Sequence, residues 1–136
     1  MGKVLKLYVS KKEVFQFEAD EKGVILDKNY AKDENRAILI ATKRSYDIAI
    51  NNGIEITNGC LGENIFIDID LYHLKPTDKI KIGNSIFEVT QNCTMCRSLS
   101  KIDSKLPKLL KDDRGIFVKL VGKRDIIKVD DEVVLL

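Results

Sequence analysis

The stretch Lys79-Ile80-Lys81-Ile82-Gly83-Asn84-Ser85-Ile86-Phe87-Glu88-Val89-Thr90 decides the fold class predicted for this chain. Apolar and polar residues alternate on both sides of its centre, as they do in half-buried β-strands. The central pair Gly83-Asn84 supplies the positive-φ positions that a two-residue turn needs. We therefore predict a β-hairpin with strands at 79–82 and 85–90.

Short apolar segments of the same kind recur along the chain. We expect them to form strands at 3–9, 13–18, 23–26, 37–41, 64–69, 115–121 and 132–136. The segment 37–41 is continuously apolar, which predicts a strand buried on both faces, whereas 64–69 alternates as a half-buried strand should. Helical signals are restricted to residues 46–50, capped by Thr42 or Ser45, and to a region that Pro107 breaks. This pattern predicts a mainly β, barrel-like domain with one or two short helices.

Length and composition indicate an ordinary globular domain. The chain has 136 residues, enough to bury roughly two thirds of its unfolded surface, so we expect one domain over 1–136. A net charge of +2 gives no electrostatic case for binding nucleic acid or an anionic membrane. No apolar run approaches the roughly 18 residues that span a bilayer, and charges interrupt the N-terminal segment where a signal peptide needs an apolar core. Three cysteines without such a signal argue against a disulfide framework, and we expect a cytoplasmic protein.

Two of the three cysteines, Cys93 and Cys96, stand three positions apart directly after the predicted strand 85–90. If Asn92 caps a short helix there, Cys93 lies in its first turn, where unpaired backbone amides favour the reactive thiolate. The spacing suits redox work, metal ligation or sulfur transfer, while the structural alternative is a pair of small buried side chains. Zinc is the weakest candidate, because a four-coordinate site needs four ligands and only one further cysteine and one histidine are present.

The segment Asn58-Gly59-Cys60-Leu61-Gly62-Glu63-Asn64 is the second candidate for a site. Two glycines permit tight backbone geometry close to a ligand. Glu63 then offers an anionic acceptor, and Asn64 offers both a donor and an acceptor. Arg36 and Arg44 could bind phosphate through the bidentate fork of a guanidinium group. Taken singly, each of these residues is as typical of an ordinary turn or of an exposed, solvated charge as it is of a ligand site.

Taken in order, these segments resemble the MOSC domain, a module found at the C-terminus of eukaryotic molybdenum cofactor sulfurases and as stand-alone bacterial proteins. The specific parts are Gly62-Glu63-Asn64 and the spacing from Val89-Thr90-Gln91 to Cys96. Arg36, before the apolar run 37–41, also matches, and the similarity extends over residues 20–135. Two positions depart from the family pattern. Met95 replaces a proline that often precedes the cysteine, and Asp130-Asp131 replaces a Gly-Asp turn.

The resemblance implies a closed β-barrel similar to the barrel domain of pyruvate kinase, and a site for molybdenum cofactor, which is a pterin. It assigns sulfur, or contact with molybdenum, to Cys96, and Cys93 is expected to resolve or help hold a persulfide. Arg36 and Arg44 are expected to hold the cofactor phosphate. Glu63 and Asn64 match motif positions near the site without a settled role in the family, and our hypothesis is that they bind the edge of the pterin.

The function implied by the resemblance is cofactor binding together with sulfur transfer through a persulfide that a partner cysteine desulfurase loads onto Cys96. The chain shows no lysine site for pyridoxal phosphate, so it is not expected to extract sulfur from free cysteine by itself. Two alternatives stay open. One is a molybdenum-dependent reductase of N-hydroxylated compounds, with Cys96 as a ligand of the metal. The other is non-catalytic delivery of cofactor to a molybdoenzyme partner.

Overall fold

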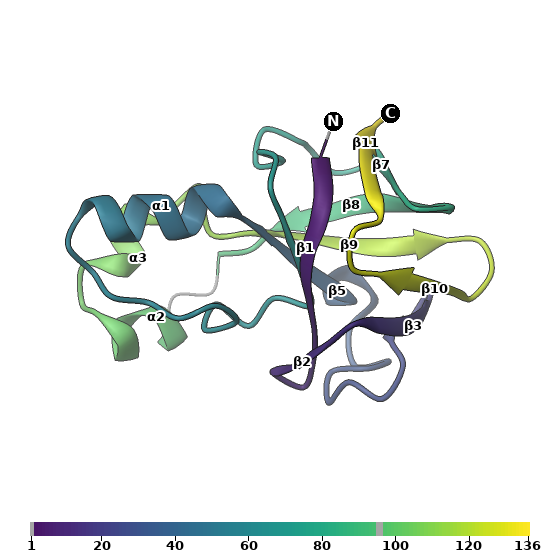
Figure 1. Ribbon diagram of the computed structural model, residues 1–136, viewed down its shortest axis with the longest axis horizontal. Coiled ribbons are helices and arrows are strands. Elements are labelled where there is room, and N and C mark those ends of the chain that lie inside the picture. The colour runs from purple at the N-terminus through teal and green to yellow at the C-terminus, as the bar shows by residue number, and fades with distance from the viewer. Residues whose placement is uncertain (1, 95–96) are drawn as a thin grey trace.

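The computed structural model describes residues 2–94 and 97–136 (Figure 1). Cys96 lies outside the described residues, so its expected role stays a prediction. In chain order the elements are β1 (Gly2–Val9), β2 (Lys12–Val14), β3 (Gln16–Asp20), β4 (Gly23–Val24), η1 (Glu34–Arg36), β5 (Ile38–Thr42), α1 (Lys43–Asn51), β6 (Ile65–Ile67), β7 (Lys79–Ile82), β8 (Ser85–Asn92), α2 (Arg97–Ile102), α3 (Leu106–Leu109), β9 (Ile116–Val121), β10 (Asp125–Lys128) and β11 (Glu132–Leu135).

Within the described residues, seven strands close into a barrel in the order β11, β7, β8, β9, β5, β6 and β1, because β1 also pairs with β11. Neighbouring strands run antiparallel, except that β5 and β6 are parallel. A parallel pair needs a crossover connection, which α1 and the loop after it supply. The hairpin partner β2 pairs with the end of β1. The prediction of a mainly β, closed barrel is confirmed.

Alternate side chains of the barrel strands point inward and form the main core. β7 alternates between buried isoleucines and exposed lysines, as the hairpin pattern predicts. All five residues of β5 are buried, because Ile38 and Ile40 face the barrel core while Ala41 faces a second apolar cluster. The prediction of a strand buried on both faces near 37–41 is confirmed.

The helices form a layer on one side of the barrel (Figure 1). Their apolar side chains share the second cluster with Phe66 of β6, whose ring meets that of Tyr46 edge to face at a centroid distance of 5.1 Å. All three residues of β6 are therefore buried. The prediction that 64–69 is half-buried is wrong, because this layer covers the face that the alternation assigns to solvent.

The helices in the described part of the chain are short. α1 has 9 residues and follows Thr42 in the N-cap position, although the Thr42 side chain makes no capping hydrogen bond. α2 has 6 residues and α3 has 4, with Pro107 in the first turn of α3, which confirms the broken helical region. None of the helices described is long and apolar enough to cross a membrane.

The structure differs from the sequence predictions in two strands and one turn. The segment 13–18 is two strands, β2 and β3, which separate at Phe15, and β3 pairs with β10 and β4 in a separate three-stranded sheet. The hydrophobic pattern does not predict β10, because the strand has only two apolar residues between charged ones. At the β7–β8 turn only Gly83 has a positive φ, of 59°, as in a type II′ turn, so the expected positive φ of Asn84 is wrong.

The helix expected to begin at Asn92 is also absent from that position. β8 continues through Asn92, and the N–H of Cys93 donates to the carbonyl of Gly115 at 3.0 Å, which prolongs the contact with β9. Cys93 is 2% exposed and packs against Leu39 and Phe117. The first described residue of α2 comes later, so the predicted placement of Cys93 in the first turn of a helix is wrong.

Candidate functional site

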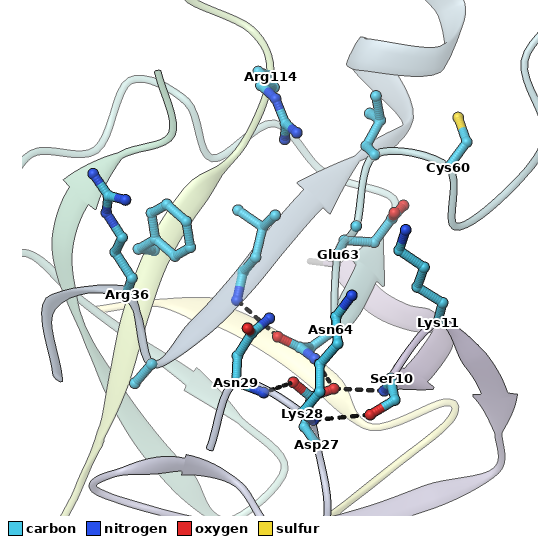
Figure 2. Close-up of a pocket in the computed structure, with 15 residues that line it drawn as sticks. Ser10, Lys11, Asp27, Lys28, Asn29, Arg36, Cys60, Glu63, Asn64 and Arg114 are labelled. Carbon is cyan, nitrogen blue, oxygen red and sulfur yellow. Dashed lines mark hydrogen bonds between the residues drawn. The ribbon is translucent and has the colours of Figure 1, made fainter. Parts of the chain in front are cut away.

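A pocket of about 240 Å³ lies where the β1–β2 turn and the loops after β4 and before β6 meet the start of β5 and β9 (Figure 2). Its wall includes Ala37 from the barrel core and Leu61 from the second apolar cluster. The residues that line it are Ser10, Lys11, Asp27, Lys28, Asn29, Arg36, Ala37, Leu39, Cys60, Leu61, Gly62, Glu63, Asn64, Arg114 and Phe117.

The β1–β2 turn carries Lys11 to this pocket. Ser10 and Lys11 have φ angles of 48° and 70°, left-handed values that two-residue hairpin turns usually assign to Asn and Gly. Asp27 stabilises the turn, because its Oδ1 accepts the N–H of Ser10 at 2.5 Å. The hydroxyl of Ser10 in turn accepts the N–H of Lys28 at 2.8 Å. These bonds offset the strain of the left-handed residues, roughly 1–2 kcal/mol each, and hold both lysine backbones at the pocket.

Asn64 joins three segments of the pocket wall. Its Oδ1 accepts the N–H of Leu39 at 3.1 Å, and its Nδ2 donates to the carbonyl of Tyr8 and to Oδ1 of Asp27, both at 3.3 Å. Its backbone also pairs with β5 and β1, through the carbonyl of Leu39 and the N–H of Tyr8, at 2.8 Å in each case. The side-chain amide is therefore engaged with the protein at both ends, which suits it to holding the wall in place.

Glu63 is the buried acidic group of the pocket. The residue is only 2% exposed, and Oε2 accepts a hydrogen bond from the Tyr46 hydroxyl at 2.6 Å. Its other oxygen, Oε1, has no hydrogen-bond partner among the residues that the structure describes. Burial raises the pKa of Glu63, and the Tyr46 bond and the charge of Arg114 oppose this only in part. A buried oxygen without a partner is costly, so it calls for an explanation such as a bound ligand.

Tyr8 and Cys60 share the surroundings of Glu63. The buried Tyr8 hydroxyl has no hydrogen-bond partner in the described part of the chain, and burial, with the charge of Glu63, raises its pKa to about 12. Burial also raises the pKa of the Cys60 thiol, and the Glu63 charge adds to this effect. Both groups therefore keep their protons at neutral pH.

The pocket that contains Glu63 also has basic side chains in its lining. They are Lys11, Lys28, Arg36 and Arg114. Lys11, Lys28 and Arg36 are exposed, while Arg114 is 3% exposed. Arg36 and Lys11 approach the pocket from opposite sides in Figure 2. The arrangement combines one buried hydrogen-bond acceptor with several cations, which suits a ligand that has a donor edge and an anionic group.

Three residues expected at the cofactor site, Arg36, Glu63 and Asn64, line this one pocket. Arg44 does not line it. Arg44 lies on α1, where its Nε is 2.7 Å from Oδ1 of Asp113 in an exposed ion pair.

Cys93 lies behind the pocket wall. It contacts Leu39 and Phe117, and both of these side chains line the pocket. Cys96, the residue expected to hold sulfur, lies outside the described residues. Sequence reasoning left Cys60 without a role, yet the structure places it in the pocket wall together with Glu63.

Several functional groups of the pocket have no signal in the sequence. In the sequence, Lys11 and Lys28 are indistinguishable from ordinary surface charges. Tyr46 fits the apolar face of a predicted helix, and Arg114 fits a charged loop. They come from four separate segments, and only barrel closure and the helical layer bring them to one place. The left-handed Ser10–Lys11 turn lacks the Asn-Gly signature that identifies such turns in a sequence.

The Glu63→Gln variant is expected to gain stability relative to the wild type as the pH rises. Folding raises the pKa of Glu63 above its ordinary value of 4.5, so the folded state holds the proton more tightly than the unfolded state. This contribution is fully present below pH 4.5 and is lost as the pH rises through the higher folded pKa. Glutamine can still accept the Tyr46 bond but does not titrate.

Denaturant unfolding of both proteins between about pH 4 and pH 8 measures this difference. The exposed Glu55→Gln change is the matched control, and it should leave the pH dependence of the wild type unaltered. A Glu63→Gln protein whose stability relative to the wild type stays constant, or falls as the pH rises, would contradict the expected burial of a high-pKa carboxyl group.

Comparison with known proteins supports the fold and identifies a family match. Residues 27–134 match the MOSC domain. The YuaD protein from Bacillus subtilis superposes with a TM-score of 0.83 at 18% identity, covering 98% of this chain and 94% of that one. YiiM from Geobacillus stearothermophilus gives 0.78 at 16% identity, covering 100% and 75% of the two chains. YiiM from Escherichia coli gives 0.77 at 18%, covering 100% and 70%. A comparison with curated proteins finds no match.

Proposed function

This chain belongs to the MOSC domain family, and from that premise we propose that it binds molybdenum cofactor, or a related phosphate-bearing pterin, in the pocket of Figure 2. The family is associated with binding of this cofactor. The observation that carries the proposal is the unpartnered Oε1 of Glu63, which lies on a buried side chain in a pocket ringed by basic residues.

The residues present fit such a group. A pterin carries an amino group beside a ring N–H, and together these donors match a carboxylate acceptor such as Glu63. A phosphate needs cations or N–H donors, which Lys11, Lys28 and Arg36 provide at the pocket opening. When bound, the cofactor would supply a redox-active molybdenum centre.

The protein's own residues then divide into two roles. Glu63 orients the pterin edge, and the basic residues hold the phosphate end. Asn64 keeps the wall in place through its bonds to Leu39 and Tyr8, so we assign it a positioning role in place of the direct pterin contact expected at first. We assign no phosphate contact to Arg44, since it pairs with Asp113 away from the pocket lining.

Sulfur transfer is the second part of the proposal, and it rests on the family resemblance of Cys96. The thiolate of Cys96 attacks the outer sulfur of a persulfide on a partner cysteine desulfurase. The partner's S–S bond breaks, a new S–S bond forms on Cys96, and the partner's cysteine leaves as a thiolate that takes up a proton. The exchange needs no external oxidant or reductant. Burial of Cys93 behind Leu39 and Phe117 suits a supporting role more than first contact with the donor.

Cofactor binding is tested by purifying the wild type and Glu63→Gln from a host that makes molybdenum cofactor. Native mass spectrometry and the fluorescence of the released, oxidised pterin should show ligand on the wild type. Loss of one charge-assisted hydrogen bond should weaken binding by about 10- to 100-fold in Glu63→Gln, measured by titration with the isolated pterin.

Glu55→Gln, a change of the same chemistry at an exposed loop residue, is the matched control and should bind like the wild type. Equal pterin occupancy in Glu63→Gln and the wild type would show that this carboxylate does not contact the ligand. A wild type that carries no pterin from a cofactor-making host, and binds none in titration, would overturn the proposal as a whole.

A further inference from the structure

We propose that Cys60 is a second sulfur acceptor of this pocket, taking the outer sulfur of a small anionic persulfide while Tyr46 and Glu63 accept its proton. The inference rests on the proposed function, because it assigns a substrate class to the same pocket. It adds a nucleophile that is separate in the sequence from the Cys93–Cys96 pair.

The backbone presents Cys60 at the pocket in a defined turn. The N–H of Cys60 donates to the carbonyl of Thr57, and that of Gly62 donates to the carbonyl of Gly59, both at 3.1 Å. Gly59 has a φ of +86°, and a Cβ there would lie 2.9 Å from the ring of Tyr8. The loop therefore packs its backbone directly on a buried aromatic ring, and Cys60 stays partly exposed in the pocket wall.

A chain of hydroxyl and carboxyl groups leads away from the thiol. The Tyr46 hydroxyl interacts with the Cys60 side chain, accepts the N–H of Gly59 at 3.0 Å and donates to Oε2 of Glu63 at 2.6 Å. The protonated thiol of Cys60 needs a base to remove its proton before the sulfur can attack. The buried carboxylate of Glu63 has a raised pKa and is therefore a better proton acceptor than a solvated carboxylate. Tyr46 connects the two groups.

The unpartnered Oε1 of Glu63 is an independent sign that this end of the pocket receives something. It belongs to a residue that is 2% exposed, and the nearby Tyr8 hydroxyl also has no partner among the described residues. Among the described residues, Arg114, Lys11 and Tyr72 are further ionisable groups near this end. In Figure 2 the carboxylate of Glu63 lies between Cys60 and Lys11, so the acid, the thiol and a cation share one side of the pocket.

The size and charge of the pocket favour a persulfide over a disulfide. Each sulfur of a disulfide is bonded to a carbon group, whereas the outer sulfur of a persulfide has none and is a chain end that can enter a pocket of about 240 Å³. The basic opening favours a donor with carboxylate groups. Sulfur is also the electrophile on which thiolates exchange readily.

The reaction is balanced without an added reagent. Glu63 takes the thiol proton through Tyr46, and the Cys60 sulfur attacks the outer sulfur of the persulfide. The donor's S–S bond breaks as the new S–S bond forms on Cys60. The leaving thiolate takes the proton back, so a thiol and a persulfide give a persulfide and a thiol.

The test uses glutathione persulfide as the probe and the full-length Cys96→Ser protein, so that sulfur on Cys60 cannot come from Cys96. Peptide mass spectrometry should show an added mass of about 32 Da on the peptide that contains Cys60. The added Tyr46→Phe or Glu63→Gln change should slow this loading about 100-fold at neutral pH. At a pH that ionises the thiol directly, all three proteins should reach the same rate.

That recovery at high pH distinguishes a proton-accepting role from structural damage. Variants that are equally slow at every pH would overturn the roles of Tyr46 and Glu63. Wild-type protein that loads sulfur on Cys96 but never on Cys60 would overturn the inference and leave the proposed function intact. Pterin titration of the wild type is the separate measurement on the proposed function, so a protein that binds pterin but never loads sulfur on Cys60 overturns this inference alone.

Discussion

Reversing the charges of Lys11 and Arg36 together is expected to weaken binding of the phosphate-bearing ligand by at least about 1000-fold. Each side chain is exposed and lines the pocket from a different segment. A charge-assisted hydrogen bond contributes about 1.5–3 kcal/mol, and two of them would be lost while two carboxylates are placed beside the phosphate. Among the described contacts, the ion pair of Arg36 with Asp33 spans 3.9 Å between exposed groups.

Titration of the Lys11→Glu/Arg36→Glu double variant with pterin phosphate, at two salt concentrations, measures this effect. Wild-type affinity should fall as salt rises, whereas the residual binding of the variant should lose that dependence. Lys79→Glu/Lys123→Glu has the same charge change at exposed residues outside the pocket lining and is the matched control. Equal losses in the two double variants would attribute the effect to net charge instead of to the pocket.

Replacing Gly115 with alanine is expected to lower the free energy of unfolding by about 3 kcal/mol. A Cβ at this position would lie 2.9 Å from the carbonyl oxygen of Ile40 and 3.0 Å from Cδ1 of Leu39. The first contact is with the backbone of a central barrel strand, which cannot move aside as a side-chain end can. The strain would fall on the β5–β9 pairing beside the pocket wall, so ligand affinity should fall as well.

Denaturant unfolding measures the stability change, and Gly53→Ala is the informative control. Gly53 has a φ of +74°, but a Cβ there meets nothing within 4 Å, so its replacement should cost only the roughly 1–2 kcal/mol of a left-handed residue. If Gly115→Ala unfolds like the wild type, the close approach of β5 and β9 must relax at little cost, and the argument for a rigid pocket wall fails.

The sequence predicted the individual strands well where the hydrophobic pattern is local and regular. The hairpin at 79–90 is present, and the run 37–41 is a strand buried on both faces. The same pattern failed for 64–69, because alternation cannot reveal that a helical layer covers the outer face of β6. The capping preference of Asn also misled the prediction at Asn92, where pairing with β9 extends the strand through the position expected to cap a helix.

Some residues of the candidate site could also be predicted from local sequence, whereas others could not. Glu63 and Asn64 could be selected from the sequence because they stand next to each other directly after a loop with two glycines. Cys60 belongs to that loop, but a single cysteine carries little information until its neighbours are known. Tyr46, which supplies the hydrogen bond to Glu63, has no sequence signal of this kind.

By itself, the sequence determined the periodicity of each segment, and with it the fold class and the loop that carries the acidic residue. Local φ and ψ preferences and the alternation of side chains depend on neighbours along the chain, so they can be read from it. Only the tertiary structure decided the pairing of β1 with β11, the burial of β6 on both faces and the meeting of Lys11, Cys60, Glu63 and Arg114 in one pocket. These features depend on contacts between residues far apart in the sequence, and burial in that assembled environment is what raises the pKa of Glu63.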